Sequence, residues 1–559
     1  MLVNGKDFLR KIRSGEPIEN LRLMKGSIRG ESLAGRTLRN CTFHTVNFTE
    51  ADLSGALLER CSFHETNLAG ANFDKAVLRD CHFQKTALPG VTLRKTTFPG
   101  TSFEEITFSA EELTEAVFSE AIFSHCSFEK LEQKAIDFAK TKFLFCTFTE
   151  AAFSDVCFEE AFITDCTLEG ARFRDSSFVR ASLVDCNIER SDFSGTSLSG
   201  ASLVNLSMKG SSLDGTDLTR TTFSNVNLAG ASLVDALLSE ATFEETPIEE
   251  EMLQKIDLRK TGFSELSLSG IDLSGKDLSE IDLSGSDLSG ARLSNCTLTA
   301  ADLSETNLAG ADLRGANLDG ANLEGSNLEG TSFVQARFEG VDFDGCHLEK
   351  TDFTEATLIQ CDLAGVDLRQ IIVKNSSFQR TDMQKGNAEN LDLAGSEFLD
   401  VDFSSATLKK ANFAGVSLTG SDFAGADLSG ASLAKVSAAS TDFTGARLSE
   451  AILADGEFHQ ASFEKAELTQ ADLSRCRMNE TIFQEANAVG TKFQNTTMVY
   501  ADFSNAVLDN AHFGGADLSG AQMHAVSENG TGWENANRKG VRKTDPQRLA
   551  AETWQAPKI

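Results

Sequence analysis

The chain has 559 residues and a net charge of −32, with 41 phenylalanines beside only six prolines, two tryptophans and one tyrosine. This charge excludes direct binding to nucleic acid, because each phosphate contact needs a cation, and it disfavours anionic membrane surfaces. No apolar run approaches the ~20 residues of a membrane span, and the N-terminus MLVNGKDFLRKIRSGEP lacks the apolar stretch of a secretory signal. We expect a cytoplasmic protein, and secretion without a signal peptide stays open.

The first predicted element is a helix within residues 5–14, GKDFLRKIRS. A helix here places Phe8, Leu9 and Ile12 on one side. These apolar side chains can cover the open end of a stacked repeat structure, which repeat proteins require. Residues 1–22 are therefore predicted to form a short N-terminal helical cap.

A repeat of five residues follows and occupies residues 23–535. From Ile28 to Trp533, 97 of the 102 positions five apart hold Leu, Phe, Ile, Met, Val or Trp, and the phase never slips. A small residue stands two positions before each apolar one, Asp or Asn often lies between them, and Gly often follows two positions later. The unit is A-[DN]-[LF]-x-G, and its period fits neither an amphipathic helix nor a long strand.

The unit predicts a coil with square cross-section. Its small and large residues are two positions apart, so both point to one side of an extended segment. Four corners of about 90° then close a coil of twenty residues, and parallel coils stack at about 4.8 Å. In such a solenoid each repeat contacts only its neighbours. Phenylalanines twenty residues apart, such as Phe43 to Phe143 and Phe403 to Phe503, are expected to stack.

The stretch GADLRGANLDGANLEGSNLEG at 310–330 closely resembles the pentapeptide-repeat family, and the resemblance covers about nine-tenths of the chain. It implies an all-β fold, namely a right-handed quadrilateral parallel β-helix with a Leu/Phe core. About 25 coils at the inter-strand spacing would make a rod roughly 120 Å long.

Residues 270–277, GIDLSGKD, resemble a phosphate-binding loop until Asp277 takes the hydroxyl position. Gly270 and Gly275 are successive post-apolar glycines, and a phosphate loop needs a strand before it and a helix after it. The repeat therefore explains the pattern, and no cofactor is expected. Lys276 occupies an inward slot, where its stem can lie along the coil while the ammonium reaches solvent; a bulge is the alternative.

No catalytic or metal-binding residues are predicted. Eleven of the twelve cysteines, all except Cys157, occupy the inward small slot, where free thiols behave as small hydrophobes. No C-x-x-C pair exists, which argues against a zinc site, and neighbouring Cys and His side chains point to opposite sides, so a thiol cannot touch its base. His44 and His64 are expected to stack on adjacent coils, but two exposed histidines are a poor metal site. We do not expect an enzyme.

Three stretches depart from the unit while keeping its phase: residues 109–116, 129–137 and 246–257. Glu111 and Glu251 fall in inward slots, where a lone charge is costly, so short loops or helical turns are expected. The third stretch is a candidate point of subdivision of the repeat region. After residue 535 the pattern dissolves, and residues 536–559 are predicted to be a basic, flexible tail.

Charge is unevenly distributed along the chain. Residues 1–40 carry +5 and residues 537–559 carry +4, so the net charge of −32 leaves −41 for residues 41–536. One face concentrates acid in the outward slot before the apolar residue, and we call its eight aspartates, in nine consecutive coils, the aspartate stripe. The stripe consists of Asp282, Asp302, Asp342, Asp362, Asp382, Asp402, Asp422 and Asp442, with Asn322 in the ninth coil.

Two interpretations of the stripe stay open. Asp can simply be the residue that the repeat prefers there, or the stripe docks a basic surface of a protein partner. Like charges about 4.8 Å apart repel by something under ~1 kcal/mol per pair in water, a cost that Asn would avoid. The second interpretation therefore remains a hypothesis that charge removal can test.

Three functions are weighed. The first is a non-enzymatic, acidic scaffold that holds or spaces other proteins. The sequence DLSGKDLSEIDLSGSDLSG is similar to repeats of pentapeptide-repeat proteins associated with the bacterial contractile (type VI) secretion machinery. That resemblance would place the protein in a bacterial cytoplasm. The second is the family's class of DNA mimics that bind DNA gyrase or topoisomerase, although those relatives are generally shorter and dimerise through a C-terminal helix. The third is a secreted effector. The expected partner is a protein with a basic surface, and the oligomeric state stays open.

Overall fold

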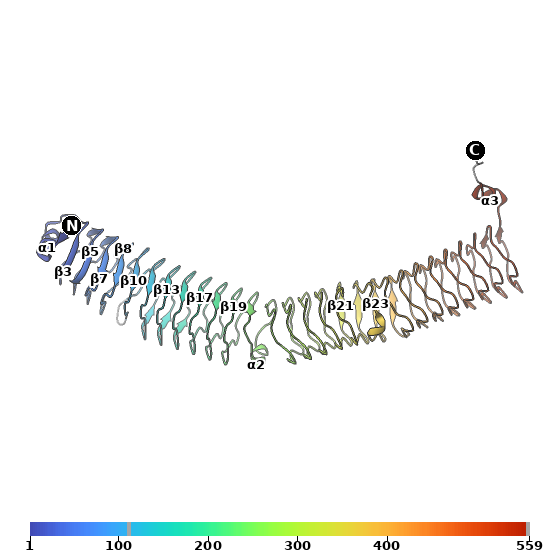
Figure 1. The fold of residues 1–559 in the computed structure, drawn as a ribbon, viewed down its shortest axis with the longest axis horizontal. Helices are drawn as coiled ribbons and strands as arrows, with labels where there is room; N and C mark the ends of the chain where they lie inside the picture. The colour runs from blue at the N-terminus through green and yellow to red at the C-terminus, as the bar shows by residue number, and fades with distance from the viewer. Residues whose placement is uncertain (109–112, 555–559) are drawn as a thin grey trace. The chain divides into compact units, whose positions relative to one another are not determined.

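The computed structural model describes residues 1–108 and 113–554 and divides the chain into two compact units, Met1–Ser267 and Leu268–Ile559. Each unit is a stack of parallel coils (Figure 1). The prediction of an all-β parallel solenoid is confirmed, with about 27 turns rather than about 25. The count is higher because the chain ends also pair: Leu2 lies opposite Arg22, and Gln522 lies opposite Arg542.

Backbone hydrogen bonds explain why five residues make one side of a coil. The Leu318 N–H donates to the Arg337 carbonyl of the next coil at 2.8 Å, and the Ala321 N–H donates to the Leu318 carbonyl at 3.0 Å to close the corner. Most corners have a left-handed residue, and Gly275 supplies one with φ 72°. Gly270, with φ 70°, forms the preceding corner. The apparent phosphate-binding loop is therefore two solenoid corners.

The core consists of the apolar and small inward residues. Phe63 and Phe83 stack with centroids 4.6 Å apart, and Phe483 and Phe503 stack at 4.7 Å, so the predicted phenylalanine ladders are confirmed. Many polar small residues are also satisfied, because their side chains reach a carbonyl of the previous coil. The Thr141 hydroxyl, for example, donates to the Phe118 carbonyl at 2.8 Å.

The first unit holds one long sheet and two shorter ones, all parallel. The 13-stranded sheet contains β1 (Leu2–Val3), β3 (Arg22–Ser27), β5 (Thr42–Asn47), β7 (Ser62–His64), β9 (His82–Gln84), β10 (Ser102–Glu104), β11 (Ile122–Ser124), β13 (Lys142–Leu144), β15 (Phe162–Thr164), β17 (Ser182–Val184), β18 (Ser202–Val204), β19 (Thr222–Ser224) and β20 (Thr242–Glu244). The shorter sheets contain β2 (Ile18–Glu19), β4 (Thr37–Arg39), β6 (Leu57–Glu59) and β8 (Val77–Arg79), and β12 (Glu132–Lys134), β14 (Ala152–Ser154) and β16 (Arg172–Arg174).

The second unit is held mainly by isolated parallel bridges. Its named strands are β21 (Arg337–Glu339), β22 (Thr357–Ile359), β23 (Ser377–Gln379), β24 (Glu397–Leu399), β25 (Gln522–Met523) and β26 (Arg542–Lys543), with a 3-10 helix η1 (Leu368–Gln370). Every pairing joins residues twenty apart. Side chains at the same position of successive coils therefore form straight rows.

The N-terminal end is covered by α1 (Gly5–Ser14), as the sequence predicts (Figure 1). Phe8 and Ile12 are buried, and the Phe8 ring meets Phe43 edge-on at 5.6 Å. The Asn4 side chain caps the helix by accepting the Asp7 N–H at 3.0 Å. The helix thus closes the apolar interior of the first coils.

Two of the three irregular stretches lie wholly within the described residues. Residues 129–137 are not a loop or helical turn: β12 (Glu132–Lys134) pairs with β14 in the ordinary register, so that expectation is wrong. Residues 246–257 do contain a helical turn, α2 (Glu250–Leu253), which exposes Glu251 and buries Met252 and Leu253. Within the first stretch, residues 109–112 lie outside the described residues, and so does Glu111.

The solenoid pairing extends beyond the predicted boundary at residue 535. β25 pairs with β26, and α3 (Pro546–Glu552) follows. His524, 5% exposed, connects the last coils to α3. Its Nε2 lies 2.9 Å from a Glu552 carboxylate oxygen, and its Nδ1 accepts the Asp545 N–H at 3.1 Å. No helix in the described part of the chain is long and apolar enough to cross a membrane.

Candidate interaction surface

The structure brings the aspartate stripe together in two runs on one face of the second unit. Asp282 and Asp302 are register partners, and Asp302 pairs with Asn322. The second run is continuous from Asp342 to Asp442, each aspartate lying opposite the next on the adjacent coil. All eight side chains are exposed or half-buried.

Each stripe aspartate has a structural task. One carboxylate oxygen accepts the backbone N–H two residues later, at 3.0 Å for Asp282, 2.8 Å for Asp342 and 2.7 Å for Asp402. This contact shapes the turn that follows the strand. Asn322 makes the same contact to the Glu324 N–H at 3.1 Å. Turn geometry therefore explains an Asp or Asn at this slot but does not require a charge.

What distinguishes the stripe is the row itself, because single carboxylates elsewhere in the described part of the unit, such as Asp287 and Asp352, also form no ion pair. Among the described residues, none of the eight stripe aspartates forms an ion pair, whereas Asp367 pairs with Arg369 at 2.7 Å and Asp427 pairs with Lys409 at 3.3 Å. These paired aspartates lie on a neighbouring face. The stripe is thus a row of carboxylates without internal neutralisation.

The electrostatic consequence is visible at Asp422. Burial raises the pKa of the Asp422 carboxyl above its ordinary value, and the negative charges of Asp402 and Asp442 on the adjacent coils raise it further. By contrast, hydrogen bonds from Ser274, together with Arg292, lower the pKa of Asp272 to about 2. The surroundings of Asp422 therefore disfavour its charged form, while those of Asp272, beside a guanidinium, stabilise it.

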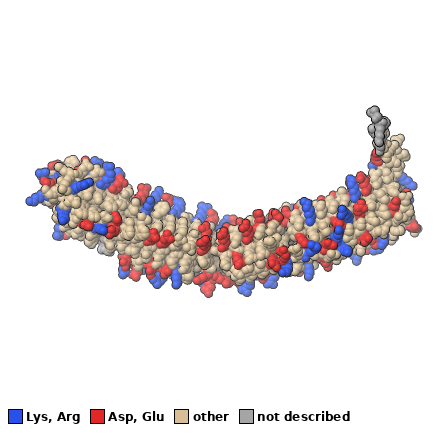
Figure 2. All heavy atoms as spheres, in the orientation of Figure 1, with Lys and Arg blue, Asp and Glu red and all other residues tan. Residues whose placement is uncertain are grey.

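Figure 2 shows that acidic and basic side chains are interspersed over the face in view of each unit, and that basic side chains gather at the N-terminal end of the first unit. That end contains nine Lys or Arg within residues 1–40. The charge segregation that the sequence predicts is therefore found at the chain ends and in single rows of side chains, and not over whole faces.

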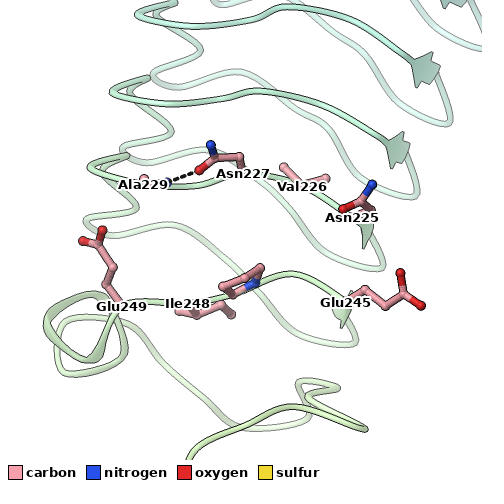
Figure 3. Close-up of a pocket in the computed structure, with 8 residues that line it drawn as sticks. Asn225, Val226, Asn227, Ala229, Glu245, Ile248 and Glu249 are labelled. Carbon is pink, nitrogen blue, oxygen red and sulfur yellow. Dashed lines mark hydrogen bonds between the residues drawn. The ribbon is translucent and has the colours of Figure 1, made fainter.

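A hollow of about 370 Å³ lies in the first unit where the coil register is interrupted (Figure 3). The bridges that connect Asn187, Ser207 and Asn227 on successive coils end at Asn227 in this part of the described chain. Pro247 follows on the next coil, and α2 then leads the chain away. The residues that line the hollow are Asn225, Val226, Asn227, Ala229, Glu245, Pro247, Ile248 and Glu249.

The hollow offers little chemistry. Glu245 and Glu249 lie near its two ends, and the Asn227 side chain is engaged by the Ala229 N–H at 3.0 Å (Figure 3). The two carboxylates are the ionisable groups of its lining, and no thiol, hydroxyl or imidazole lies beside them. The sequence indicated irregularity at 246–257 but not a cavity.

Exposed apolar side chains are a feature that the sequence reasoning missed. Phe162 in β15 is 50% exposed, and Phe145, 54% exposed, stacks on His125 with centroids 5.0 Å apart. Ile122 in β11 is also exposed. The available signal was an aromatic residue in an outward slot, because the repeat normally places Phe inward.

The cysteines and Lys276 were the other residues singled out from the sequence. All twelve cysteines are free thiols; Cys157 and Cys346 are half-buried and the other ten are buried. Burial raises the pKa of the Cys476 thiol to about 12 and that of Cys296 to about 11, which keeps both protonated and unreactive. Lys276 is half-buried, and its coil continues without a bulge through the Thr297 N–H bond to the Lys276 carbonyl at 3.0 Å.

Comparison with known proteins gives structural neighbours but no curated relative, since no curated protein matches the sequence. QnrB1, a plasmid-mediated fluoroquinolone resistance protein, is 16% identical over 34% of this chain and 94% of its own, with a TM-score of 0.24. HetL, a pentapeptide repeat protein involved in heterocyst differentiation regulation from the cyanobacterium Nostoc, is 21% identical over 50% and 90%, with a TM-score of 0.15. Rfr23 from the cyanobacterium Cyanothece is 30% identical over 19% and 81%, with a TM-score of 0.16.

Family models match most of the repeat. The model described as pentapeptide repeat region matches residues 56–138, 331–413 and 456–533. The model described as pentapeptide repeats (8 copies) matches 32–64, 163–195, 181–220, 263–299, 298–333 and 396–434. Because these ranges together span more than half of the sequence, the chain belongs to the pentapeptide repeat family.

Proposed function

We propose that this pentapeptide repeat protein is a non-catalytic scaffold whose aspartate stripe docks a basic surface of a protein partner. The observation that carries the proposal is the lack of cations along the stripe, in a unit where Asp312, Asp367 and Asp427 each have one. Membership of a family of repeat scaffolds and interaction modules supports the same general role.

The geometry of the stripe suits a partner with regularly spaced cations. Adjacent aspartates lie on paired strands about 4.8 Å apart, and the solenoid backbone fixes their positions before binding. A lysine or arginine side chain of a partner can reach each carboxylate oxygen that the turn leaves unused. Since rim charges mainly govern association rate and salt dependence, binding should weaken as ionic strength rises.

A DNA-mimic role against gyrase is less well supported. A duplex presents two phosphate strands, with one charge per ~1.7 Å of axis, whereas the stripe carboxylates form a single row. Many other acids are neutralised by neighbouring coils, as Asp319 is by Arg337 at 2.9 Å and Asp455 by Arg475 at 2.7 Å.

Two charge-matched variants test the proposal. The stripe variant replaces Asp342, Asp362, Asp382 and Asp402 with Asn. The control variant makes the same change at Asp287, Asp352, Asp392 and Asp517, which lie on other faces and accept the same N–H bond at 3.0, 2.9, 3.2 and 3.0 Å. Both variants lose four charges and keep the turn acceptor; the control aspartates Asp287, Asp392 and Asp517 also accept an Asn side chain from the next coil.

The measurement is affinity capture from bacterial lysate with the native chain and both variants, followed by mass spectrometry. The proposal predicts a protein that is captured by the native chain and the control variant, lost with the stripe variant, and released by added salt. Capture that is equal for all three preparations would end the docking role of the stripe.

The identity of a stripe-dependent protein decides the finer function. Components of a contractile secretion apparatus would make the chain an accessory of that machinery, the role suggested by the DLSGKDLSEIDLSGSDLSG repeats. Gyrase or topoisomerase subunits would instead favour the DNA-mimic class. A host protein would favour the effector function.

A further inference from the structure

Two histidines near the N-terminal end lie face to face on adjacent strands. His44 in β5 is the register partner of His64 in β7, and their rings stack with centroids 4.6 Å apart and planes 10° apart. The twenty-residue coil forces this alignment, because Phe43 and Phe63, one position earlier, stack in the core beneath them at 5.0 Å. The two imidazoles are thus held together by the backbone rather than by chance rotamers.

A carboxylate completes the group. Glu65 follows His64 at the coil corner, and its Oε1 lies 3.7 Å from the His64 Nε2. One donor atom from each of His44, His64 and Glu65 lies within 4.8 Å of the other two, and no other such cluster of His, Cys, Asp or Glu occurs among the described residues. From the sequence, the two exposed histidines alone were expected to be a poor metal site. In the structure, Glu65 supplies a third donor.

We propose that His44, His64 and Glu65 form a binding site for a late first-row divalent cation of the Zn²⁺ class. Imidazole nitrogen and carboxylate oxygen are ligands of Zn²⁺, Co²⁺, Ni²⁺ and Cu²⁺, while Mg²⁺ and Ca²⁺ prefer oxygen alone. Two histidines and one carboxylate are a known open Zn²⁺ ligand set that leaves a fourth position for water or a partner's ligand.

Coordination needs the side chains to rearrange, because the two rings are nearly parallel and their in-plane lone pairs must turn toward one ion. With Zn–N and Zn–O bonds near 2.1 Å, donors of one tetrahedral ion lie about 3.4 Å apart, so a separation of up to 4.8 Å must contract by about 1.4 Å. Both histidine side chains are half-buried and Glu65 is exposed, so rotation about their side-chain torsions can provide the movement.

Nearby charges do not block the site. Lys85, at the same corner position one coil after Glu65, pairs with Glu105 at 3.4 Å. Met24 is the register partner of His44 on the other side, and its side chain is 47% exposed. The site therefore has a thioether beside it and a lysine engaged elsewhere.

His82 provides a matched control. It lies on the same sheet, its Nε2 is 3.8 Å from Glu104, and its Nδ1 is 2.8 Å from the Ser102 hydroxyl. It thus has a carboxylate neighbour but no stacked histidine. A surface that binds Zn²⁺ unspecifically would respond to loss of His82 as much as to loss of His44.

The test is calorimetric titration of the chelator-stripped full chain with Zn²⁺, carried out with Cys157 and Cys346 replaced by Ser because these two thiols are not fully buried. We expect one saturable ion per chain. Since loss of an outer partner alone costs about 10–100-fold in metal affinity, H44Q and H64Q should each weaken binding by at least about tenfold, E65Q should also weaken it, and H82Q should not. Visible absorption of bound Co²⁺ should report a coordination sphere that changes in the same three variants.

Several results would overturn the proposal. An absence of saturable binding would reject the site, and equal loss in H82Q and H44Q would reduce it to unspecific surface binding. Affinity unchanged in E65Q would remove the third ligand and with it the site as proposed. The three substitutions are on the surface, and circular dichroism and thermal unfolding without metal would show that the solenoid is intact.

Discussion

Asp422 is the register partner of Asp402 on the adjacent coil, and burial together with the charges of Asp402 and Asp442 raises its pKa. The pair shows in one contact what the whole stripe does: the repeat aligns like charges and supplies no cation between them. Their turn contacts, to the Ser404 and Ala424 N–H groups at 2.7 Å each, could be made equally by Asn.

Removing stripe charge should therefore stabilise the protein. The stripe variant (D342N, D362N, D382N, D402N) is expected to raise the free energy of unfolding by up to about 1 kcal/mol for each like-charge pair removed in water, and by less at high salt. Urea unfolding at two ionic strengths measures the change. The control variant on the other faces should change less, and a stripe variant no more stable than that control would show that the repulsion is negligible.

The titration of Asp422 should depend on Asp402. A folded-state pKa above that of the unfolded chain means that protonation favours folding. The contribution is fully present below the unfolded value of about 3.9 and is lost as the pH rises through the folded pKa. In D402N, site-resolved carboxyl NMR should find the pKa of Asp422 lower, though still raised because burial remains. An Asp422 pKa that moves as much in D287N as in D402N would contradict the register explanation.

The phase of the repeat made much of this geometry predictable. An unbroken period of five fixes which residues lie twenty apart, so the pairing of Asp402 with Asp422 and the stack of Phe483 on Phe503 follow from counting. The cap helix was equally predictable, because Phe8 and Ile12 need an apolar surface to cover. Periodicity carries this information because every coil has the same length.

The repeat pattern predicts wrongly where the backbone keeps its pairing although the side chains depart from the repeat unit. Residues 129–137 depart from the repeat unit, which suggested a loop or helical turn, yet β12 pairs normally because Leu131 and Ile136 are buried around it. Ion pairs were also beyond the sequence, since Lys409 reaches Asp427 across a corner from a position 18 residues away. The row that lacks cations could be recognised only after such contacts were visible.

The phenylalanine ladder should contribute strongly to stability. Phe443 is fully buried between Phe423 at 5.1 Å and Phe463 at 4.8 Å. F443A is expected to cost about 3–5 kcal/mol of unfolding free energy because it leaves a cavity that rigid coils cannot close. F443L should cost less, because Leu303 fills the same slot in another coil. Chemical denaturation compares the two, and equal losses would show that the volume restored by leucine is unimportant there.

Cysteine labelling should follow burial. Cys157 is half-buried in an outward slot, while Cys476 is buried and its thiol, with a pKa of about 12, stays protonated. Although burial also raises the pKa of Cys157, a brief alkylation of the native protein should modify Cys157 before the ten buried thiols, as read by peptide mass spectrometry. Because Cys346 is the other half-buried thiol, C157S together with C346S should abolish the fast phase, and denaturant should release the remaining sites. Rapid modification of Cys476 in the native state would mean that its coil opens readily, which a continuous hydrogen-bonded solenoid does not allow.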